Sequence, residues 1–148
     1  ADVLGVDLPD TCAEDSVSNL PLWKDPGSPE VRKDIVHQSI DGSLSIRRGQ
    51  YKLELCPGSG GWSDPIPGKE DTTAPRFQLY DLSMDISERR NVIEDHLELA
   101  SELKEVLKGY IENGRSTPGA PQSNNGQRIW NTIGWLDEED GGEIKIYK

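Results

Sequence analysis

The sequence has few aromatic and apolar side chains from which to build a core. Of its 148 residues, 33% are hydrophobic and one is Phe, while 15 are Gly and 10 are Pro. This length fits one compact domain, but a low apolar content leaves little burial to offset the entropy lost when loops become ordered. We therefore expect a small core, many irregular segments and dependence on a larger neighbour.

Basic side chains are also in short supply. The chain has 16 Lys and Arg against 27 Asp and Glu, which gives a formal net charge of -11. Binding to a phosphate backbone depends on clustered Lys and Arg, so this balance argues against a nucleic-acid partner. The acidic run at residues 137–140 is typical of a solvated tail rather than of a metal site. No apolar stretch approaches the roughly 20 residues that span a bilayer, so no membrane partner is expected.

Cysteine and histidine, frequent in metal and redox sites, are rare. Cys12 and Cys56 form neither a C-x-x-C pair nor a zinc-ligand spacing, and we interpret them as free thiols, although a disulfide between them stays open. The only histidines are His37 and His96, so the sequence gives little support for a self-sufficient acid–base site. We interpret His96 as an exposed first-turn residue of a helix. For His37, a structural role and a place beside a pocket both stay open.

Residues 34–55 alternate apolar with polar side chains, as half-buried strands do. The Asp41-Gly42 pair is the strongest hairpin signal, because both residues tolerate the positive φ of a tight turn. A second turn at Arg48-Gly49 completes a three-strand meander with one apolar face.

A long irregular segment follows the meander. Residues 56–75 are Gly, Pro, Ser and charged side chains around a lone Trp62, which predicts a surface excursion. Phe77 and Leu79 then indicate a fourth short strand. The predicted fold class is α+β: a small four-stranded antiparallel sheet covered on one face by a C-terminal helix, with long loops and an extended tail.

The covering helix is predicted at residues 96–113, where apolar residues repeat at three- and four-residue spacing. Asp95 and Glu98 have the spacing of an N-cap and its capping-box partner. Gly114 follows where a left-handed residue ends many helices. The residues expected to cover the sheet are Leu103, Leu107 and Ile111.

Composition divides the chain into three parts. Residues 1–33 are polar and rich in Pro and Gly and indicate a connecting arm, residues 34–114 hold the sheet and helix, and residues 115–148 form a Pro/Gly-rich tail. The end of the tail alternates Ile with charged residues, a pattern compatible with an edge strand. Trp130 and Trp135 are expected to dock, either on this domain or on another one.

Local motifs for catalysis fail in their details. Residues 57–61 are rich in Gly, but they lack the Lys and Ser or Thr of a P-loop, and Pro57 stands where a nucleophile elbow needs its first Gly. Asp81, Asp85 and Glu88 come without the Gly and final Glu of an EF-hand loop, and Asp85 is expected to set up the turn between strand and helix. No catalytic or metal-binding residue is therefore predicted in this chain.

Four stretches, taken together and in order, carry a family pattern. They are Asp34-Ile-Val-His-Gln-Ser39 with Asp41-Gly-Ser43, Ile46-Arg-Arg-Gly-Gln-Tyr-Lys-Leu53, Leu55-Cys-Pro-Gly-Ser-Gly-Gly-Trp-Ser63, and Leu79-Tyr-Asp-Leu82 with Asp85, Glu88 and Asn91. This combination resembles the C-terminal region of type I sulfatases, the arylsulfatase family within the alkaline-phosphatase-like superfamily. The resemblance covers residues 1–121. It departs at Ile86, where the family pattern has Pro, and this affects only a turn.

The resemblance implies a parent enzyme that hydrolyses sulfate esters. Such an enzyme uses a formylglycine made from Cys or Ser in a C/S-x-P/A-x-R motif, and a calcium ion held by carboxylates of an N-terminal α/β catalytic domain. Neither Cys12 nor Cys56 stands in that motif, so the nucleophile and the metal ligands would lie outside this chain. The chain is then the C-terminal subdomain, residues 1–33 connect it to the catalytic domain as its partner, and the isolated chain is expected to be inactive.

By the same resemblance, two loops would reach the rim of the pocket that binds the sulfate-ester substrate. An exposed Trp ring there can stack on a sugar face, although capping the core is an equally good interpretation. The residues assigned to this rim are His37, Gln38, Ser39, Asp41, Ser43 and Trp62. Two other functions stay open: a stand-alone carbohydrate- or protein-binding scaffold module, and part of a phosphate-ester hydrolase of the same superfamily. For the parent, a periplasmic or secreted location and a cytoplasmic one both stay open.

Overall fold

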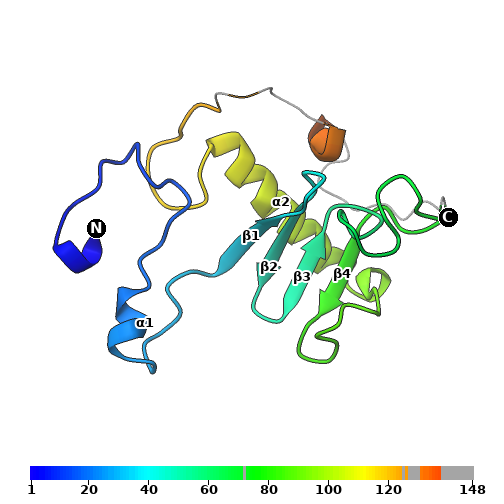
Figure 1. The fold of residues 1–148 in the computed structure, drawn as a ribbon, viewed down its shortest axis with the longest axis horizontal. Helices are drawn as coiled ribbons and strands as arrows, with labels where there is room; N and C mark the ends of the chain where they lie inside the picture. The colour runs from blue at the N-terminus through cyan, green and yellow to red at the C-terminus, as the bar shows by residue number, and fades with distance from the viewer. Residues whose placement is uncertain (72, 125, 127–130, 138–148) are drawn as a thin grey trace. The chain divides into compact units, whose positions relative to one another are not determined.

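The computed structural model describes residues 1–71, 73–124, 126 and 131–137 (Figure 1). The chain forms two compact units. Unit 1 comprises Ala1–Lys33 and Lys108–Gly126, and unit 2 comprises Asp34–Leu107 and Gln127–Lys148. Within the described part of the chain, no helix combines the length and apolar character needed to cross a membrane.

Unit 2 is built on an antiparallel sheet with the strand order β1-β2-β3-β4. Val36, Ile46, Leu53 and Leu79 stand opposite one another across the four strands, and the last three are fully buried. The apolar alternation therefore places one row of side chains in the core, which confirms the predicted meander and fourth strand. The strands are β1 (Asp34–Gln38), β2 (Leu44–Arg48), β3 (Tyr51–Glu54) and β4 (Gln78–Asp81).

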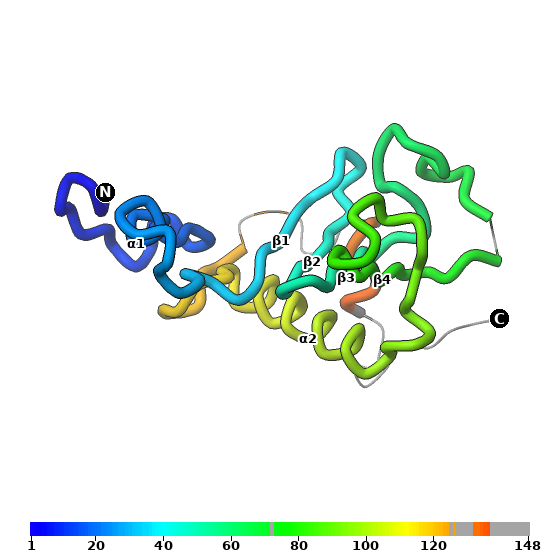
Figure 2. Tube along the Cα trace, turned by 90° about the horizontal axis from the view of Figure 1, so that it is seen from below, coloured from blue at the N-terminus to red at the C-terminus, as the bar shows by residue number. Residues whose placement is uncertain are grey.

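The long helix α2 (Leu97–Asn113) runs along the apolar face of the sheet (Figures 1 and 2). Ala100, Leu103 and Leu107 are buried on one side of α2, while Ile111 is half-buried in the part of the helix that belongs to unit 1. These positions confirm the predicted α+β fold with its helical cover.

The sequence predicted the C-terminal end of α2 correctly but not the cap at its N-terminal end. A short 3-10 helix, Ile93–Asp95, precedes α2, so His96 and not Asp95 is the residue before its first turn, and the predicted Asp95 cap is wrong. The other end is as predicted, because Gly114 has a φ of 62° and its N–H bonds to the carbonyl of Ile111.

Both hairpin connections differ in detail from the sequence prediction. Gln38 pairs with Leu44, so five residues join β1 to β2 instead of a tight two-residue turn. The Asp41 carboxylate closes this wider loop by accepting hydrogen bonds from the N–H (2.8 Å) and hydroxyl (3.1 Å) of Ser43. The next turn lies at residues 49–50, one position later than predicted, because Arg48 pairs with Tyr51.

The 3-10 helix Asn131–Asp137 contributes two large side chains to the core of unit 2. Ile133 is fully buried and Trp135 is 2% exposed, so Trp135 docks within this unit. Trp130 and the candidate edge strand at residues 143–147 lie outside the described residues.

Unit 1 contains the 3-10 helix Asp2–Leu4, the short helix α1 (Leu20–Lys24) and the segment that leaves α2. Neither short helix buries a residue. Arg115 is buried there, and its guanidinium donates to the carboxylate of Asp10 at 2.9 Å and to the carbonyl of Ala120 at 2.9 Å. Hydrogen bonds and an ion pair from Arg115 therefore hold the separate segments of unit 1 together.

Candidate functional site

The loop between β1 and β2 lies against the segment that follows β3 (Figure 2). The N–H of Asp41 donates to the carbonyl of Gly60 at 3.2 Å. Gly60 has a φ of +61°, and a Cβ at this position would come within 2.8 Å of the side chain of Ser39. The close backbone approach therefore requires glycine at position 60. The two loops assigned to a pocket rim from the sequence are thus neighbours within unit 2.

Hydrogen bonds fix the second loop, residues 56–63, from within. Ser59 donates through its hydroxyl to the carbonyl of Ser63 (2.7 Å), and through its N–H to the carbonyl of Pro65 (3.0 Å). Below it, the Nε2 of Gln78 on β4 donates to the carbonyls of Cys56 (2.9 Å) and Gly58 (2.8 Å). This segment was predicted to be irregular, and it has a defined shape without regular secondary structure.

The assigned residues differ in how far they reach the surface. His37, Gln38 and Asp41 are exposed and Ser39 is half-buried, whereas Ser43 is 3% exposed and bonds to Asp41. The buried Ser43 thus holds the exposed Asp41 carboxylate in place through hydrogen bonds.

Two large apolar side chains stand out at the same place. Trp62 is 87% exposed and Ile40 is 68% exposed, one on each loop. The position a Cβ would take on Gly61, next to Trp62, lies 3.7 Å from the side chain of Ile40. The two loops therefore each expose a large apolar side chain, and the backbone next to Trp62 lies close to Ile40.

The sheet face opposite α2 carries an ion cluster that the sequence reasoning missed. The Nζ of Lys52 lies 2.7 Å from Oε1 of Glu54 and 2.8 Å from Oε1 of Glu88. Alternation places Lys52 and Glu54 on this face, but nothing local indicates that Glu88, 36 residues from Lys52, approaches them. His37 lies on the same face, because it pairs with Ser45, which in turn pairs with Glu54.

Burial and neighbouring charges set the protonation of this face. Partial desolvation lowers the pKa of the exposed His37 side chain, and the positive charges of Lys52 and Arg47 lower it further. Its imidazole is therefore neutral at pH 7 and offers one hydrogen-bond donor and one acceptor. Burial alone would lower the pKa of Lys52, but hydrogen bonds to Glu54 and Glu88 outweigh it and raise that pKa.

Two further observations concern cysteine reactivity and metal binding among the described residues. Burial raises the pKa of the Cys56 thiol to about 11, so it stays protonated and weakly nucleophilic at neutral pH. In the part of the chain that the structure describes, no three His, Cys, Asp or Glu side chains come together to hold a metal ion. The groups that this region exposes to solvent include Trp62, Asp41 and the neutral imidazole of His37.

Comparison with known proteins shows that this chain is similar to part of a longer enzyme. No family model matches the sequence. Over 106 residues, the chain is 37% identical to an N-acetylgalactosamine-6-O-sulfatase of Bacteroides thetaiotaomicron, and the match covers 68% of this chain and 19% of that protein. A solved structure from work on the metabolism of multiple glycosaminoglycans by the same species matches with a TM-score of 0.56 and 36% identity, over 73% of this chain and 22% of that one.

A more distant solved structure shares the fold alone. Ps i-CgsB, solved in complex with k-i-k-neocarrahexaose, matches with a TM-score of 0.51 and 13% identity, over 82% of this chain and 24% of that one. The chain therefore spans about a fifth to a quarter of the length of these three relatives.

Proposed function

The chain is homologous to part of a sulfatase, as its motifs predicted, and we propose that it is the C-terminal subdomain of a sulfuric ester hydrolase. The observation that carries this proposal is 37% identity to a sulfatase over 68% of the chain, a match that takes up only 19% of that enzyme. In this role the sheet and α2 support loops that complete the rim of the substrate pocket. The partner is the catalytic domain of the same enzyme.

The rim residues contact the organic part of the substrate. The exposed ring of Trp62 stacks on the apolar face of a sugar, and Asp41 and His37 bind sugar hydroxyls. A carboxylate repels a sulfate group, so these loops recognise the sugar and leave the sulfate to other residues. The relative that acts on N-acetylgalactosamine 6-sulfate supports a sulfated sugar as the substrate class.

The formylglycine and calcium ion of the family do not fit the residues of this chain. Cys12 and Cys56 stand outside any C/S-x-P/A-x-R motif, and the described residues contain no metal-ligating cluster. The rest of the enzyme would supply both groups. The isolated chain is accordingly inactive, and its contribution to the enzyme is the positioning and selection of substrate.

Two measurements on the full-length enzyme test this function. Mass spectrometry of the peptide with the C/S-x-P/A-x-R motif should show a formylglycine, and the enzyme should release sulfate from a 6-sulfated N-acetylgalactosamine. The purified 148-residue chain should release none. Turnover proportional to the concentration of the isolated chain would contradict the proposal, and faster cleavage of the matching phosphate ester would favour the phosphate-ester hydrolase.

The assignment of Trp62 has its own control. In the full-length enzyme, Trp62→Ala should raise KM for the sulfated sugar by about tenfold, as the loss of a stacking contact of about 1.4 kcal/mol does. Trp62→Phe should keep most of the affinity, because the ring face remains. Met84→Ala removes another exposed apolar side chain, one that is 85% exposed, and should leave KM unchanged.

A second candidate function is a stand-alone carbohydrate-binding module. The exposed Trp62 and Ile40 on adjacent loops favour it, since this pair would bind a sugar without any catalytic domain. The reading frame that encodes this chain separates the two functions. An α/β domain with the C/S-x-P/A-x-R motif in the same frame supports the sulfatase, and its absence supports the binding module.

A further inference from the structure

Residues 1–33, called the arm below, contain no fully buried side chain. Apolar side chains in this arm are exposed, with exposed fractions from 55% to 80%. They are Val3, Leu4, Val6, Leu8 and Trp23. Ordering a chain segment costs conformational entropy, and these five side chains gain little apolar burial in return. Polar contacts hold the arm in place, and these five apolar side chains are left uncovered.

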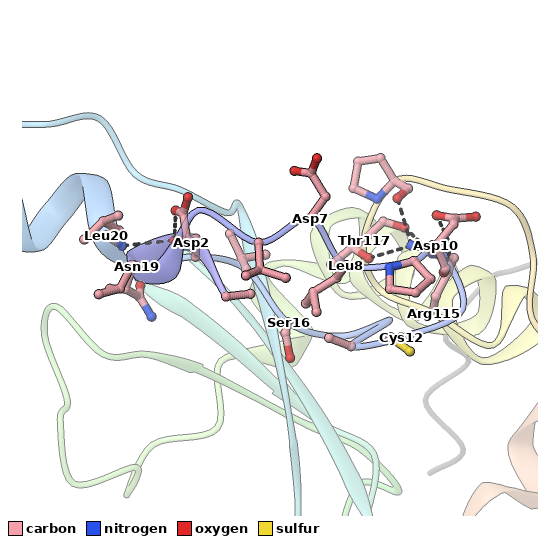
Figure 3. A pocket seen from close by; sticks show the side chains of 18 of the residues that line it. Asp2, Asp7, Leu8, Asp10, Cys12, Ser16, Asn19, Leu20, Arg115 and Thr117 are labelled. Carbon is pink, nitrogen blue, oxygen red and sulfur yellow. Dashed lines mark hydrogen bonds and ion pairs between the residues drawn. The ribbon is translucent and has the colours of Figure 1, made fainter.

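All of these side chains except Leu4 line a hollow within unit 1, shown in Figure 3. The hollow has a volume of about 690 Å³ and is lined by the arm and by the segment that leaves α2. Its apolar lining includes Val3, Val6, Leu8, Val17, Leu20 and Trp23. We name it the arm hollow. Its lining mixes apolar and polar side chains, and its volume is in the range that a drug-sized group or a few protein side chains fill.

The rim of the arm hollow is acidic. Residues 1–20 carry five carboxylates and no Lys or Arg. Asp2, Asp7 and Asp10 are among the residues that line the hollow. A complementary occupant would present apolar side chains to the hollow and basic side chains to its rim.

The walls of the arm hollow are joined across the sequence. The Nη1 of Arg115 donates to the carboxylate of Asp10, and its Nε donates to the carbonyl of Thr117 at 3.0 Å. The hydroxyl of Thr117 donates to the carbonyl of Glu14 at 2.5 Å. These contacts shape the hollow before an occupant arrives, which lowers the entropy cost of docking.

We propose that the arm hollow is a docking surface for an apolar segment of the catalytic part of the same polypeptide, flanked there by Lys or Arg. This rests on the proposed function, since the chain spans about a fifth of the length of its sulfatase relative and the occupant belongs to the remainder. The exposed side chains of Val3, Val6, Leu8 and Trp23 account for the apolar part of the occupant. The carboxylates of Asp2 and Asp7 in the lining account for its basic flanks.

Cys12 provides a direct probe, because it is exposed and lines the arm hollow. Maleimide labelling, followed peptide by peptide with mass spectrometry, compares the native full-length enzyme with the isolated 148-residue chain. Docking should make Cys12 at least about tenfold slower to label in the full-length enzyme, the factor that about 1.4 kcal/mol of protection gives. Equal labelling rates in the two proteins would overturn the proposal.

Variants of the full-length enzyme identify the surface. Val6→Ser with Leu8→Ser should raise the labelling rate of Cys12 toward that of the isolated chain, and Leu8→Met alone should not. Ile86→Ser changes an exposed apolar side chain of unit 2 and should have no effect. Protection of Cys12 in the isolated chain that grows with its concentration would instead identify a second copy as the occupant, and would overturn the proposal.

Salt tests the basic flanks. Raising the ionic strength should speed labelling of Cys12 in the full-length enzyme, because it screens carboxylates from Lys and Arg. A labelling rate independent of salt would overturn this part. Labelling does not depend on turnover, so an enzyme that cleaves no sulfate ester yet protects Cys12 would refute the proposed function and leave the docking surface standing.

Discussion

Arg115 and Asp10 form an ion pair between residues 105 positions apart in the chain, with Nη1 2.9 Å from Oδ1. The Arg115 side chain is 7% exposed, and its Nε and Nη2 donate to the carbonyls of Thr117 and Pro118, each at 3.0 Å. One buried guanidinium thus organises a unit whose N-terminal arm has no apolar core. The arm therefore depends on this set of polar contacts, called the clamp below, rather than on apolar packing.

Replacing the guanidinium tests this clamp. Arg115→Lys keeps the charge but loses the planar set of donors, so most of the carbonyl contacts disappear. We expect amide hydrogen exchange in residues 6–17 to accelerate, with a loss of about 2 kcal/mol in local stability. Arg90→Lys, at a side chain that is 79% exposed, is the matched control and should change nothing. Unchanged exchange in Arg115→Lys would show that the clamp is dispensable.

The same contact gives the arm a pH dependence. A backbone hydrogen bond from Ala120 and the Arg115 guanidinium lower the pKa of Asp10 below its ordinary value of 3.8. The folded state therefore favours the ionised form of Asp10. The stability that this carboxylate contributes is complete above its pKa in the unfolded chain and is lost as pH falls through its pKa in the folded chain. We expect hydrogen exchange of the arm, corrected for its intrinsic pH dependence, to accelerate below about pH 4. Asp10→Asn should remove this acceleration, and a persisting acceleration would assign it to another group.

The sequence predicted the elements whose signal is local. Alternation over residues 34–55 specified three strands, and three- and four-residue spacing specified α2, because burial of one face imposes those periods. Gly114 ended the helix for a reason that is also local. The predicted cap of α2 at Asp95 was wrong, because Asp95 belongs to a 3-10 helix that precedes α2.

Contacts between distant residues were out of reach of these patterns. No period relates Arg115 to Asp10, or Glu88 to Lys52, so neither ion pair could be predicted. The family resemblance assigned both loops to one pocket rim, but neither it nor periodicity predicted that they contact each other. Its physical basis, the close approach of Gly60 to Ser39, appears only in three dimensions.

The Lys52 cluster should respond differently to loss of its cation and loss of one anion. Burial raises the pKa of Glu54 above its ordinary value despite Lys52, so ionised Glu54 costs stability as pH rises above about 4.5. Glu54→Gln should therefore change stability little at pH 7, since Lys52 keeps Glu88. Lys52→Met leaves two facing carboxylates and should lose about 2 kcal/mol. Urea unfolding at pH 7 measures both, and equal losses would contradict the asymmetry.

Glu88 combines an ion pair with an unusual backbone. Its φ is 54°, a left-handed conformation that costs a side-chain-bearing residue about 1 kcal/mol. Both Glu88→Ala and Glu88→Gly remove the contact with Lys52, but only glycine also relieves the strain. We expect Glu88→Gly to be more stable than Glu88→Ala by about 1 kcal/mol in urea unfolding. Alanine as stable as glycine would mean that the left-handed conformation carries no cost here.

The contact between the rim loops can be disturbed while backbone strain is held constant. Gly60 and Gly49 have φ values of +61° and +56°, but a Cβ would meet Ser39 at 2.8 Å only at position 60, and nothing within 4 Å at position 49. Gly60→Ala and Gly49→Ala should therefore lose a similar increment of about 1 kcal/mol to strain, and Gly60→Ala should in addition separate the loops. In the full-length enzyme we expect KM for a sulfated sugar to rise in Gly60→Ala and to stay constant in Gly49→Ala. A shared rise would trace the effect to general destabilisation, whereas a rise confined to Gly60→Ala would tie substrate binding to the spacing of the two loops.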